Sequence, residues 1–272
     1  MRWHSAAFVF LLVSGAAGAS SQEGLTITVL YDNTVCTQGT RGDWGFSCFI
    51  QGRTDTILYD GGAQDSILLG NAEALGIDLS RTKRVFLSHP HLDHAGGLAG
   101  PLAKVPGAPV FVGASFTPSV VEAIVREGGE LVPVTGPVEI SKGFSSTGEF
   151  SSRIGVTEQA LIIDTDSGVV VVVGCSHPGI VEMVGKVRKG TGKAIFAVVG
   201  GFHLLRHTRE EVDAVIRGLR MLGVRKCGAT HCTGKEQIEW ISEAYGSDFL
   251  PMGVGRVLHF PGLAVPTNSQ ER

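Results

Sequence analysis

The sequence predicts a single layered domain of the α/β (α+β) class over residues 24–260. Its composition suits a large buried core, because 43% of the 272 residues are hydrophobic and 18% are charged, which excludes extended disorder. Glycine occurs 38 times, about twice the ~7% usual in globular proteins, and indicates many tight turns. Short apolar runs fall into two groups with helical segments between them, which is typical of a layered fold.

The elements of the first half are predicted from hydrophobic periodicity. Residues 25–31 alternate between apolar and polar side chains, as a half-buried strand does. The apolar run at 84–88 is a second strand that leads directly into a group of histidines. Further strands are expected at 45–50, 56–59 and 110–112, and helices at 66–75 and 118–127.

The second half repeats this alternation. Two apolar runs flank the turn residues 165–168 and predict a β-hairpin. An amphipathic helix is expected at 210–222, because its apolar residues recur at helical spacing. The other expected elements are strands at 194–199, 224–230 and 254–260 and a helix at 236–245.

The first nineteen residues have the layout of a cleavable export signal. Arg2 precedes an apolar run at 6–13, and the small residues at 17–19 form a signal-peptidase site. The alternative, an uncleaved membrane anchor, needs about 20 apolar residues, and this run is shorter. We therefore expect a signal peptide at 1–19, a periplasmic or secreted protein, and no membrane span after cleavage. Residues 261–272 are predicted to be a disordered tail.

The net charge limits which binding partners are expected, and the cysteine content limits which disulfides are conceivable. The net charge of −3 gives no basic surface for nucleic acid, so we expect a small-molecule substrate and no nucleic-acid partner. Export permits disulfides, and two cysteine pairs are conceivable. These are Cys36 with Cys48 and Cys227 with Cys232. The oligomeric state is not predicted.

Three histidines and an aspartate lie within six residues, in His89-Pro90-His91-Leu92-Asp93-His94. Imidazole nitrogens and carboxylate oxygens are ligands that zinc, iron and manganese share. His89 and His91 are two residues apart, so in extended chain they project to one side. Asp93 and His94 begin a helix and turn toward a second point. The cluster therefore predicts one or two divalent transition metals side by side, with zinc as the first choice and iron or manganese open.

Three later histidines each follow a predicted strand and have glycine neighbours. They are His177, His203 and His231. Each one alone is equally consistent with a buried core histidine. Ligands, however, bind at the ends of strands on one edge of a sheet, and three such histidines favour a common site. His207 and His259 lack this context and are interpreted as surface or core residues.

These motifs together resemble the metallo-β-lactamase superfamily. The order of motifs is similar to the subfamily that contains archaeal dihydropterin–aminobenzene ribofuranosyl phosphate synthases and many metal-dependent hydrolases. The resemblance covers about residues 24–260. Its motifs are Asp32-Asn33-Thr34, Leu87-Ser88-His89 to Leu98, Glu158-Gln159-Ala160-Leu161, Gly174-Cys175-Ser176-His177-Pro178-Gly179-Ile180, Gly200-Gly201-Phe202-His203-Leu204, His231-Cys232-Thr233-Gly234 and Gly253-Val254-Gly255.

The resemblance implies a four-layer αββα sandwich with metals at one sheet edge. By position, His89 and His91 would hold the first metal, Asp93 and His94 the second, and His231 would be the last ligand. The superfamily usually has a bridging aspartate where this chain has Gly174-Cys175-Ser176-His177, so His177, or less favourably Cys175, would take that place. The residues at 110–115 lack the histidine that many members have there, and His177 or His203 would substitute. Trp44 stands where subfamily members often have histidine.

The function implied first is an exported metal-dependent hydrolase in which a metal-activated water attacks an ester, lactone, amide or phosphoester bond. Asp93 would be both ligand and proton acceptor, and His203 would steady the developing anion. The first alternative is a transferase of the dihydropterin condensation type that releases pyrophosphate. The second alternative is a non-catalytic metal or redox sensor that uses Cys175 and Cys232.

Overall fold

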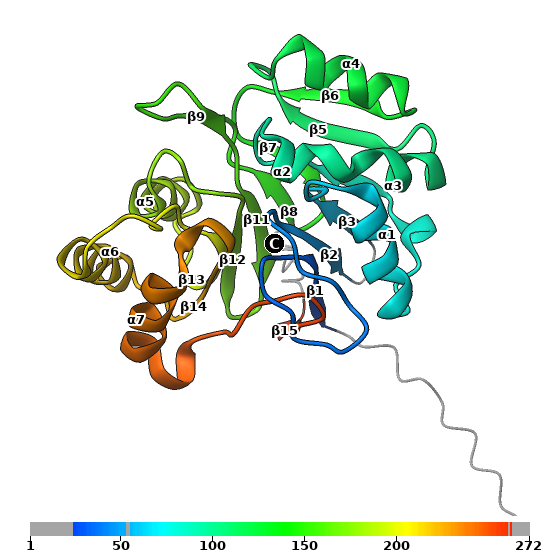
Figure 1. Cartoon of the computed structure of the whole chain (residues 1–272). Coiled ribbons are helices and arrows are strands. Elements are labelled where there is room, and N and C mark those ends of the chain that lie inside the picture. Colours follow the sequence, from blue (N-terminus) through cyan, green and yellow to red (C-terminus); the bar gives the residue numbers. More distant parts are fainter. Residues whose placement is uncertain (1–23, 53–54, 261, 263–272) are drawn as a thin grey trace, which may run out of the picture.

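Two β-sheets pack face to face, and helices cover the outer face of each (Figure 1). The structure is a computed structural model that describes residues 24–52, 55–260 and 262. The predicted signal peptide lies outside the described residues, as does the predicted tail apart from Gly262. The layers confirm the predicted class, and their order is helix, sheet, sheet, helix.

The first sheet has seven strands and ends in a parallel half. The order across it is β15 (Val257–Phe260), β1 (Leu25–Tyr31), β2 (Ser47–Gln51), β3 (Thr56–Tyr59), β4 (Arg84–Phe86), β5 (Pro109–Gly113) and β6 (Glu130–Val134). Pairs from β15 to β3 are antiparallel, and pairs from β3 to β6 are parallel. The carboxyl ends of β3 and β4 therefore lie at the same edge.

The second sheet has six strands, three of them parallel neighbours. Its order is β14 (Lys226–Thr230), β13 (Ile195–Gly201), β12 (Gly168–Val173), β11 (Leu161–Thr165), β8 (Phe144–Ser146) and β7 (Val138–Ser141). Strands β12, β13 and β14 run parallel, so their carboxyl ends also share one edge. A small separate hairpin joins β9 (Phe150–Ser151) to β10 (Thr157–Glu158).

The helices divide between the two outer faces in chain order. The first sheet carries α1 (Asp65–Ala74), α2 (Leu92–Ala95), α3 (Ala99–Lys104) and α4 (Pro118–Arg126), and the second carries α5 (Ile180–Thr191), α6 (Arg209–Met221) and α7 (Lys235–Tyr245) (Figure 1). Short 3₁₀ turns lie at η1 (Leu79–Arg81), η2 (Gly96–Leu98), η3 (His231–Thr233) and η4 (Gly246–Asp248).

Three apolar cores hold these layers together, and burial of apolar surface is the main favourable term in folding. The central core lies between the sheets and includes the stacked rings of Tyr59 and Phe86, whose centroids are 5.4 Å apart. A second core joins the second sheet to α5, α6 and α7. A third joins the first sheet to its own helices. The sheets are therefore buried on both faces, which fits their nearly continuous apolar runs.

Most predicted elements are confirmed within a few residues, but the strands β6 to β10 and the helix α5 are not among the predicted elements. Gly185 and Gly190 lie inside this helix, and glycine weakens helices in isolation. Its buried face consists of Ile180, Met183, Val184 and Val187, at the spacing of one helical stripe. Packing of that stripe against the second sheet outweighs the weak local preference.

Two further expectations concern cysteines and membranes. All five cysteines are free, so neither conceivable disulfide is formed. Within the described part of the chain, no helix has both the length and the apolar character needed to cross a bilayer.

Candidate metal centre

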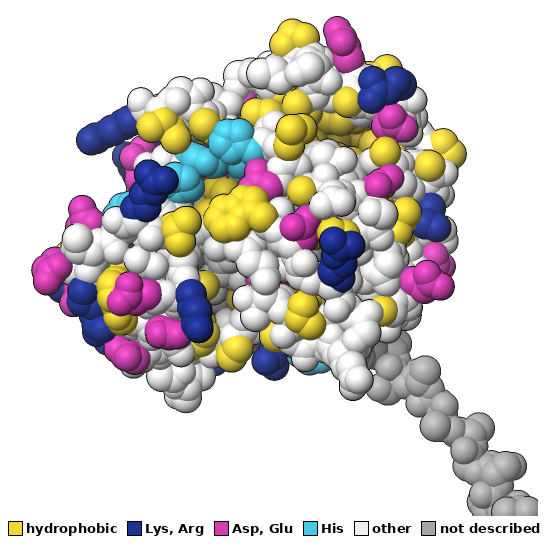
Figure 2. Space-filling model, viewed as in Figure 1, with side chains coloured by type: hydrophobic (Ala, Val, Ile, Leu, Met, Phe, Trp, Pro, Cys, Tyr) yellow, Lys and Arg dark blue, Asp and Glu magenta, His cyan; other side chains and the backbone are white. Residues whose placement is uncertain are grey.

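The strand ends of both sheets bring their histidines to one place. His89 follows β4, His177 follows β12, His203 follows β13, and His231 is the residue directly after β14. Figure 2 shows histidine side chains gathered in one patch on this face, with hydrophobic and acidic side chains beside it. The common site that the sequence predicted from these positions is therefore a feature of the fold.

A first group of possible metal ligands combines the two sheets. His89, Cys175 and His177 each place one ligand atom within 4.8 Å of the others. The ring of His91 adjoins this group, with its centroid 4.8 Å from the His89 ring and 4.9 Å from the His177 ring. His91 is the exposed member, so the group opens to solvent on its side.

A second group lies directly beside the first. His94, Cys175 and His231 also have ligand atoms within 4.8 Å of one another. The Asp93 carboxylate joins them, because its Oδ2 lies 3.3 Å from His231 Nε2 and 3.9 Å from His94 Nε2. All six predicted metal residues thus come together in the structure. Cys175 belongs to both groups, whereas sequence reasoning ranked it behind His177.

The hydrogen bonds of four histidines engage Nδ1, so Nε2 is the nitrogen that can bind a metal. Each Nδ1 faces an oxygen, and in each pair the imidazole N–H donates and the oxygen accepts. The Nε2 lone pair then points into the site. The pairs are His94 with Asp60 at 2.7 Å, His177 with Glu158 at 2.9 Å, His231 with Asn33 at 3.0 Å, and His89 with the Ser88 hydroxyl at 2.9 Å.

Three of these nitrogens support a metal directly. Among the described atoms, His89 Nε2 is buried without any hydrogen-bond partner, and such an orphan costs about 1–3 kcal/mol. The Nε2 atoms of His94 and His231 face each other at 3.3 Å. Because both rings carry their hydrogen on Nδ1, both Nε2 atoms are hydrogen-bond acceptors, and neither can donate to the other. A cation in each group would give all three nitrogens a partner, so the donor set fits a metal.

Burial keeps the imidazoles of His89 and His94 neutral, and the neutral imidazole is the form that binds a metal. Burial first, and then repulsion from His231, lower the pKa of His94 to about 3. Burial and the neighbouring His94 also hold the pKa of His89 well below its usual value.

Carboxylates behind the histidines orient them, as outer partners of metal ligands do. Burial acts to raise the pKa of Glu158, but the hydrogen bond from His177 and the nearby His89 outweigh it and lower the pKa to about 2. Asp60 accepts from both the backbone N–H and the hydroxyl of Ser88 at 2.7 Å. Sequence reasoning assigned no role to Glu158, Asp60 or Asn33, since each stands apart from the histidines along the chain.

The backbone is strained at this site. Four non-glycine residues of the described chain have positive φ, and all four belong to the site or its immediate support: Asp60 (52°), Ser176 (62°), His203 (54°) and His231 (51°). Such conformations cost about 1–3 kcal/mol each and persist where the surroundings impose them. They favour a functional origin for the loop geometry.

His203 lies beside the metal groups and belongs to neither of them. Its ring centroid is 4.6 Å from that of His177. Both residues line a cavity of about 220 Å³ together with His207 and Phe202. His207, which sequence reasoning placed on the surface or in the core, is therefore a neighbour of the candidate site.

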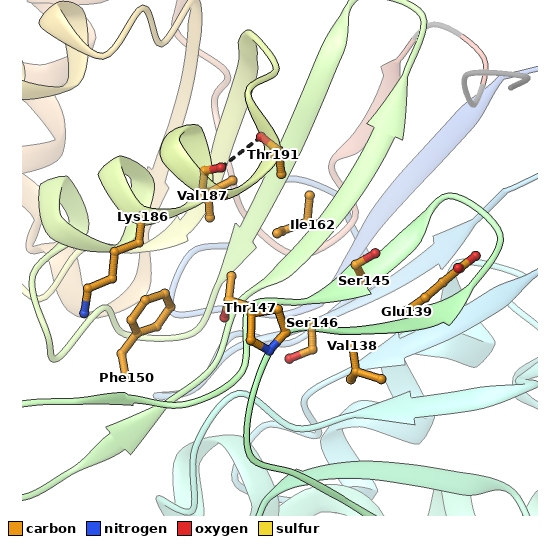
Figure 3. A pocket seen from close by; sticks show the side chains of 12 residues that line it. Val138, Glu139, Ser145, Ser146, Thr147, Phe150, Ile162, Lys186, Val187 and Thr191 are labelled. Atoms are coloured by element: carbon orange, nitrogen blue, oxygen red, sulfur yellow. Dashed lines mark hydrogen bonds between the residues drawn. The ribbon is translucent and has the colours of Figure 1, made fainter. Parts of the chain in front are cut away.

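The rim of the site is partly apolar. Trp44 is 47% exposed, and its ring centroid lies 4.8 Å from that of His231. Leu92, between two candidate ligands in sequence, is 75% exposed. A separate cavity of about 470 Å³ lies between α5 and the strands β7, β8 and β11, where Lys186, Ile162 and Glu139 face it (Figure 3). No histidine lines that second cavity.

Comparison with known proteins agrees with the fold. The sequence profile of the metallo-beta-lactamase superfamily matches residues 45–181, and the chain belongs to this superfamily. The resemblance seen in the sequence, and the αββα sandwich that it implied, are thereby confirmed.

Individual relatives differ in activity. The chain is 29% identical over 247 residues to a 7,8-dihydropterin-6-methyl-4-(β-D-ribofuranosyl)-aminobenzene-5′-phosphate synthase of Methanocaldococcus jannaschii, covering 75% of this chain and 84% of the synthase. A crystal structure of a metal-dependent hydrolase of the β-lactamase superfamily superposes with a TM-score of 0.73 and 26% identity, covering 87% of this chain and 99% of that one. The metallo-beta-lactamase fold protein YhfI of Bacillus subtilis superposes with a TM-score of 0.61 and 14% identity, covering 87% of this chain and 100% of that one.

Proposed function

We propose that the chain is a metal-dependent hydrolase that cleaves an ester, lactone, amide or phosphoester bond of a small molecule. The observation that carries this proposal is the pair of adjacent ligand groups, in which four Nε2 atoms converge at a partly open sheet edge. Divalent ions in such a site lower the pKa of water and polarise the bond under attack. We propose one or two divalent transition metals, zinc first.

Two side chains of the site are suited to move or hold charge during hydrolysis. The side chain of Asp93 is 21% exposed and lies at the second group, so its carboxylate can accept a proton from the attacking water. His203 is exposed beside His177, where its ring can donate a hydrogen bond to an oxygen that gains negative charge. Both roles match those that the sequence suggested.

The test is a panel of ester, lactone, amide and phosphodiester probes on purified protein. We expect turnover of at least one class, loss of that turnover with a chelator, and recovery with zinc. Stoichiometric metal binding without turnover of any probe would favour the sensor alternative.

A transferase is the second candidate, because the synthase of M. jannaschii is similar over most of both chains. A transferase of that type would need two substrates and would release pyrophosphate. Pyrophosphate formation that depends on a second, acceptor substrate would therefore identify this activity, whereas a hydrolase needs only water as co-substrate.

The His203→Ala variant should keep its metal and lose rate. His203 belongs to neither ligand group, and loss of a supporting group typically costs ~10–100-fold in activity. Metal content, melting temperature and turnover should be measured on the same sample, with His177→Ala as the comparison that loses metal. Metal loss in His203→Ala together with retention in His177→Ala would reverse the assignment.

We also propose that the protein is exported. The support is the layout of residues 1–19, and the mature chain is then expected to begin near Ser20. N-terminal sequencing of protein from the native cell's periplasm or medium checks this. Intact Met1 on the soluble cytosolic protein would argue against export.

A further inference from the structure

The sulfur of Cys175 lies between the two ligand groups. Within the part of the chain that the structure describes, Cys175 is the one residue common to both groups, one with His89 and His177 and the other with His94 and His231. Its Sγ is 3.2 Å from His94 Nε2. In two-metal sites the ions lie about 3.5–4 Å apart, so a side chain common to both groups is placed to contact both ions.

The carboxylates of Asp93 and Glu158 bind other partners and do not lie between the two ligand groups. Asp93 contacts only the second group, through His231 and His94. Glu158 uses Oε1 to accept from the backbone N–H groups of Cys175 and Ser176, at 2.9 and 2.8 Å. Its Oε2 accepts from the backbone N–H and Nδ1 of His177, both at 2.9 Å. The thiol is therefore the group left between the two positions that can become an anion.

The chain around Cys175 fixes the sulfur in place. Gly201 N–H donates to the Gly174 carbonyl at 2.9 Å, and the Ser176 hydroxyl donates to the Gly201 carbonyl at 2.8 Å. A Cβ on Gly174 would lie 2.2 Å from the Ser88 hydroxyl oxygen, so only glycine permits this close approach of the two sheets. The loop is thus held from both sides.

We propose that the Cys175 thiolate is a ligand of both ions, at the place where the superfamily usually has a bridging aspartate. The inference rests on the proposed metal-dependent function. When the ions bind, sulfur–metal bonds replace the S–H bond and the proton leaves to solvent, without change of oxidation state. Because thiolates favour zinc over manganese, this ligand also narrows the metal class to zinc-like ions.

Cobalt(II) is the probe, since it replaces zinc and reports on sulfur ligands. Metal-free full-length protein is titrated with Co²⁺ while the ultraviolet and visible spectra are followed. We expect a thiolate-to-cobalt charge-transfer band that saturates with the bound metal. A wild-type protein that binds Co²⁺ without this band would overturn the proposal.

Two cysteine variants separate the ligand from its neighbour. Cys175→Asp, which restores a carboxylate, should bind the same number of ions but lose the band and shift the zinc-to-manganese preference toward manganese. Cys232→Ser is the matched control, because Cys232 belongs to neither ligand group. Its thiol adjoins Cys175, with Sγ 3.6 Å from the Cys175 carbonyl oxygen, and this variant should keep the band. Circular dichroism and the visible cobalt bands establish that each variant is folded and loaded.

Other results have distinct meanings. A band that persists in Cys175→Asp, or that disappears in Cys232→Ser, contradicts the assignment of Cys175. A wild-type band without hydrolysis of any probe leaves the ligand assignment standing and counts against the hydrolase. Failure of the wild type to bind any Co²⁺ or Zn²⁺ refutes both proposals.

Discussion

The double variant His89→Ala/His91→Ala is expected to lose most of its metal and to lose turnover by at least about 100-fold, the upper end of the effect of losing an outer partner. His89 supplies a buried Nε2 to the first group, and His91 stands over the same group from its exposed side. Without both rings, that position keeps only Cys175 and His177. Elemental analysis of protein purified in parallel with the wild type measures the loss.

A histidine far from the site provides the control for this variant. His259 lies on β15, opposite Thr26 of β1, and is exposed. His259→Ala should therefore match the wild type in metal content, melting temperature and turnover. If the double variant retained wild-type metal, the ligand assignment at His89 and His91 would be wrong.

The Glu158→Gln variant is expected to lose both stability and metal. The buried carboxylate accepts four hydrogen bonds from the loop that carries Cys175 and His177. An amide group of the same shape turns one acceptor into a donor that faces two N–H groups. Leaving buried donors unpaired costs about 1–3 kcal/mol each, so we expect the free energy of unfolding to fall by roughly 2–5 kcal/mol. Metal affinity should fall by ~10–100-fold.

Denaturant unfolding with and without chelator separates the two effects of this variant. The metal-free forms report the lost hydrogen bonds alone, and the difference in the presence of zinc reports the lost ligand positioning. Glu149→Gln is the matched control, because its carboxylate binds the exposed Ser115. That change should stay within about 0.5 kcal/mol. If Glu158→Gln and Glu149→Gln had equal free energies of unfolding, Glu158 would not stabilise the loop that carries Cys175 and His177.

The parts of the site that could be predicted are those with a local signature. His89 to His94 lie within six residues, so their chemistry is visible without any fold. His177 and His231 can be predicted because each follows a strand, and parallel strands of one sheet end at the same edge. Two groups of apolar strands with helices between them predict a layered α/β or α+β domain, and the resemblance to the superfamily implies the αββα sandwich.

The remaining features depend on tertiary contacts. Cys175 is a single cysteine next to a histidine, and nothing in its neighbourhood along the chain shows that it lies between two groups. Asp60 and Glu158 follow or end short strands like many surface carboxylates, and only packing shows that both are fully buried. The position of His207 beside the site is hidden for the same reason, since the cavity beside His203 forms between segments from different elements.

The two ligand groups draw on both halves of the chain. His89 and His94 follow β4 of the first sheet, whereas Cys175, His177 and His231 follow strands of the second. An ion held there would crosslink the two sheets of the sandwich. The free-ion concentration of the compartment would therefore determine how much the bound ion adds to the free energy of unfolding. At 100 times the dissociation constant, one ion adds about 2.7 kcal/mol to stability. Metal-starved cells would then degrade this protein faster, which makes metal supply a control on its abundance as well as on its chemistry.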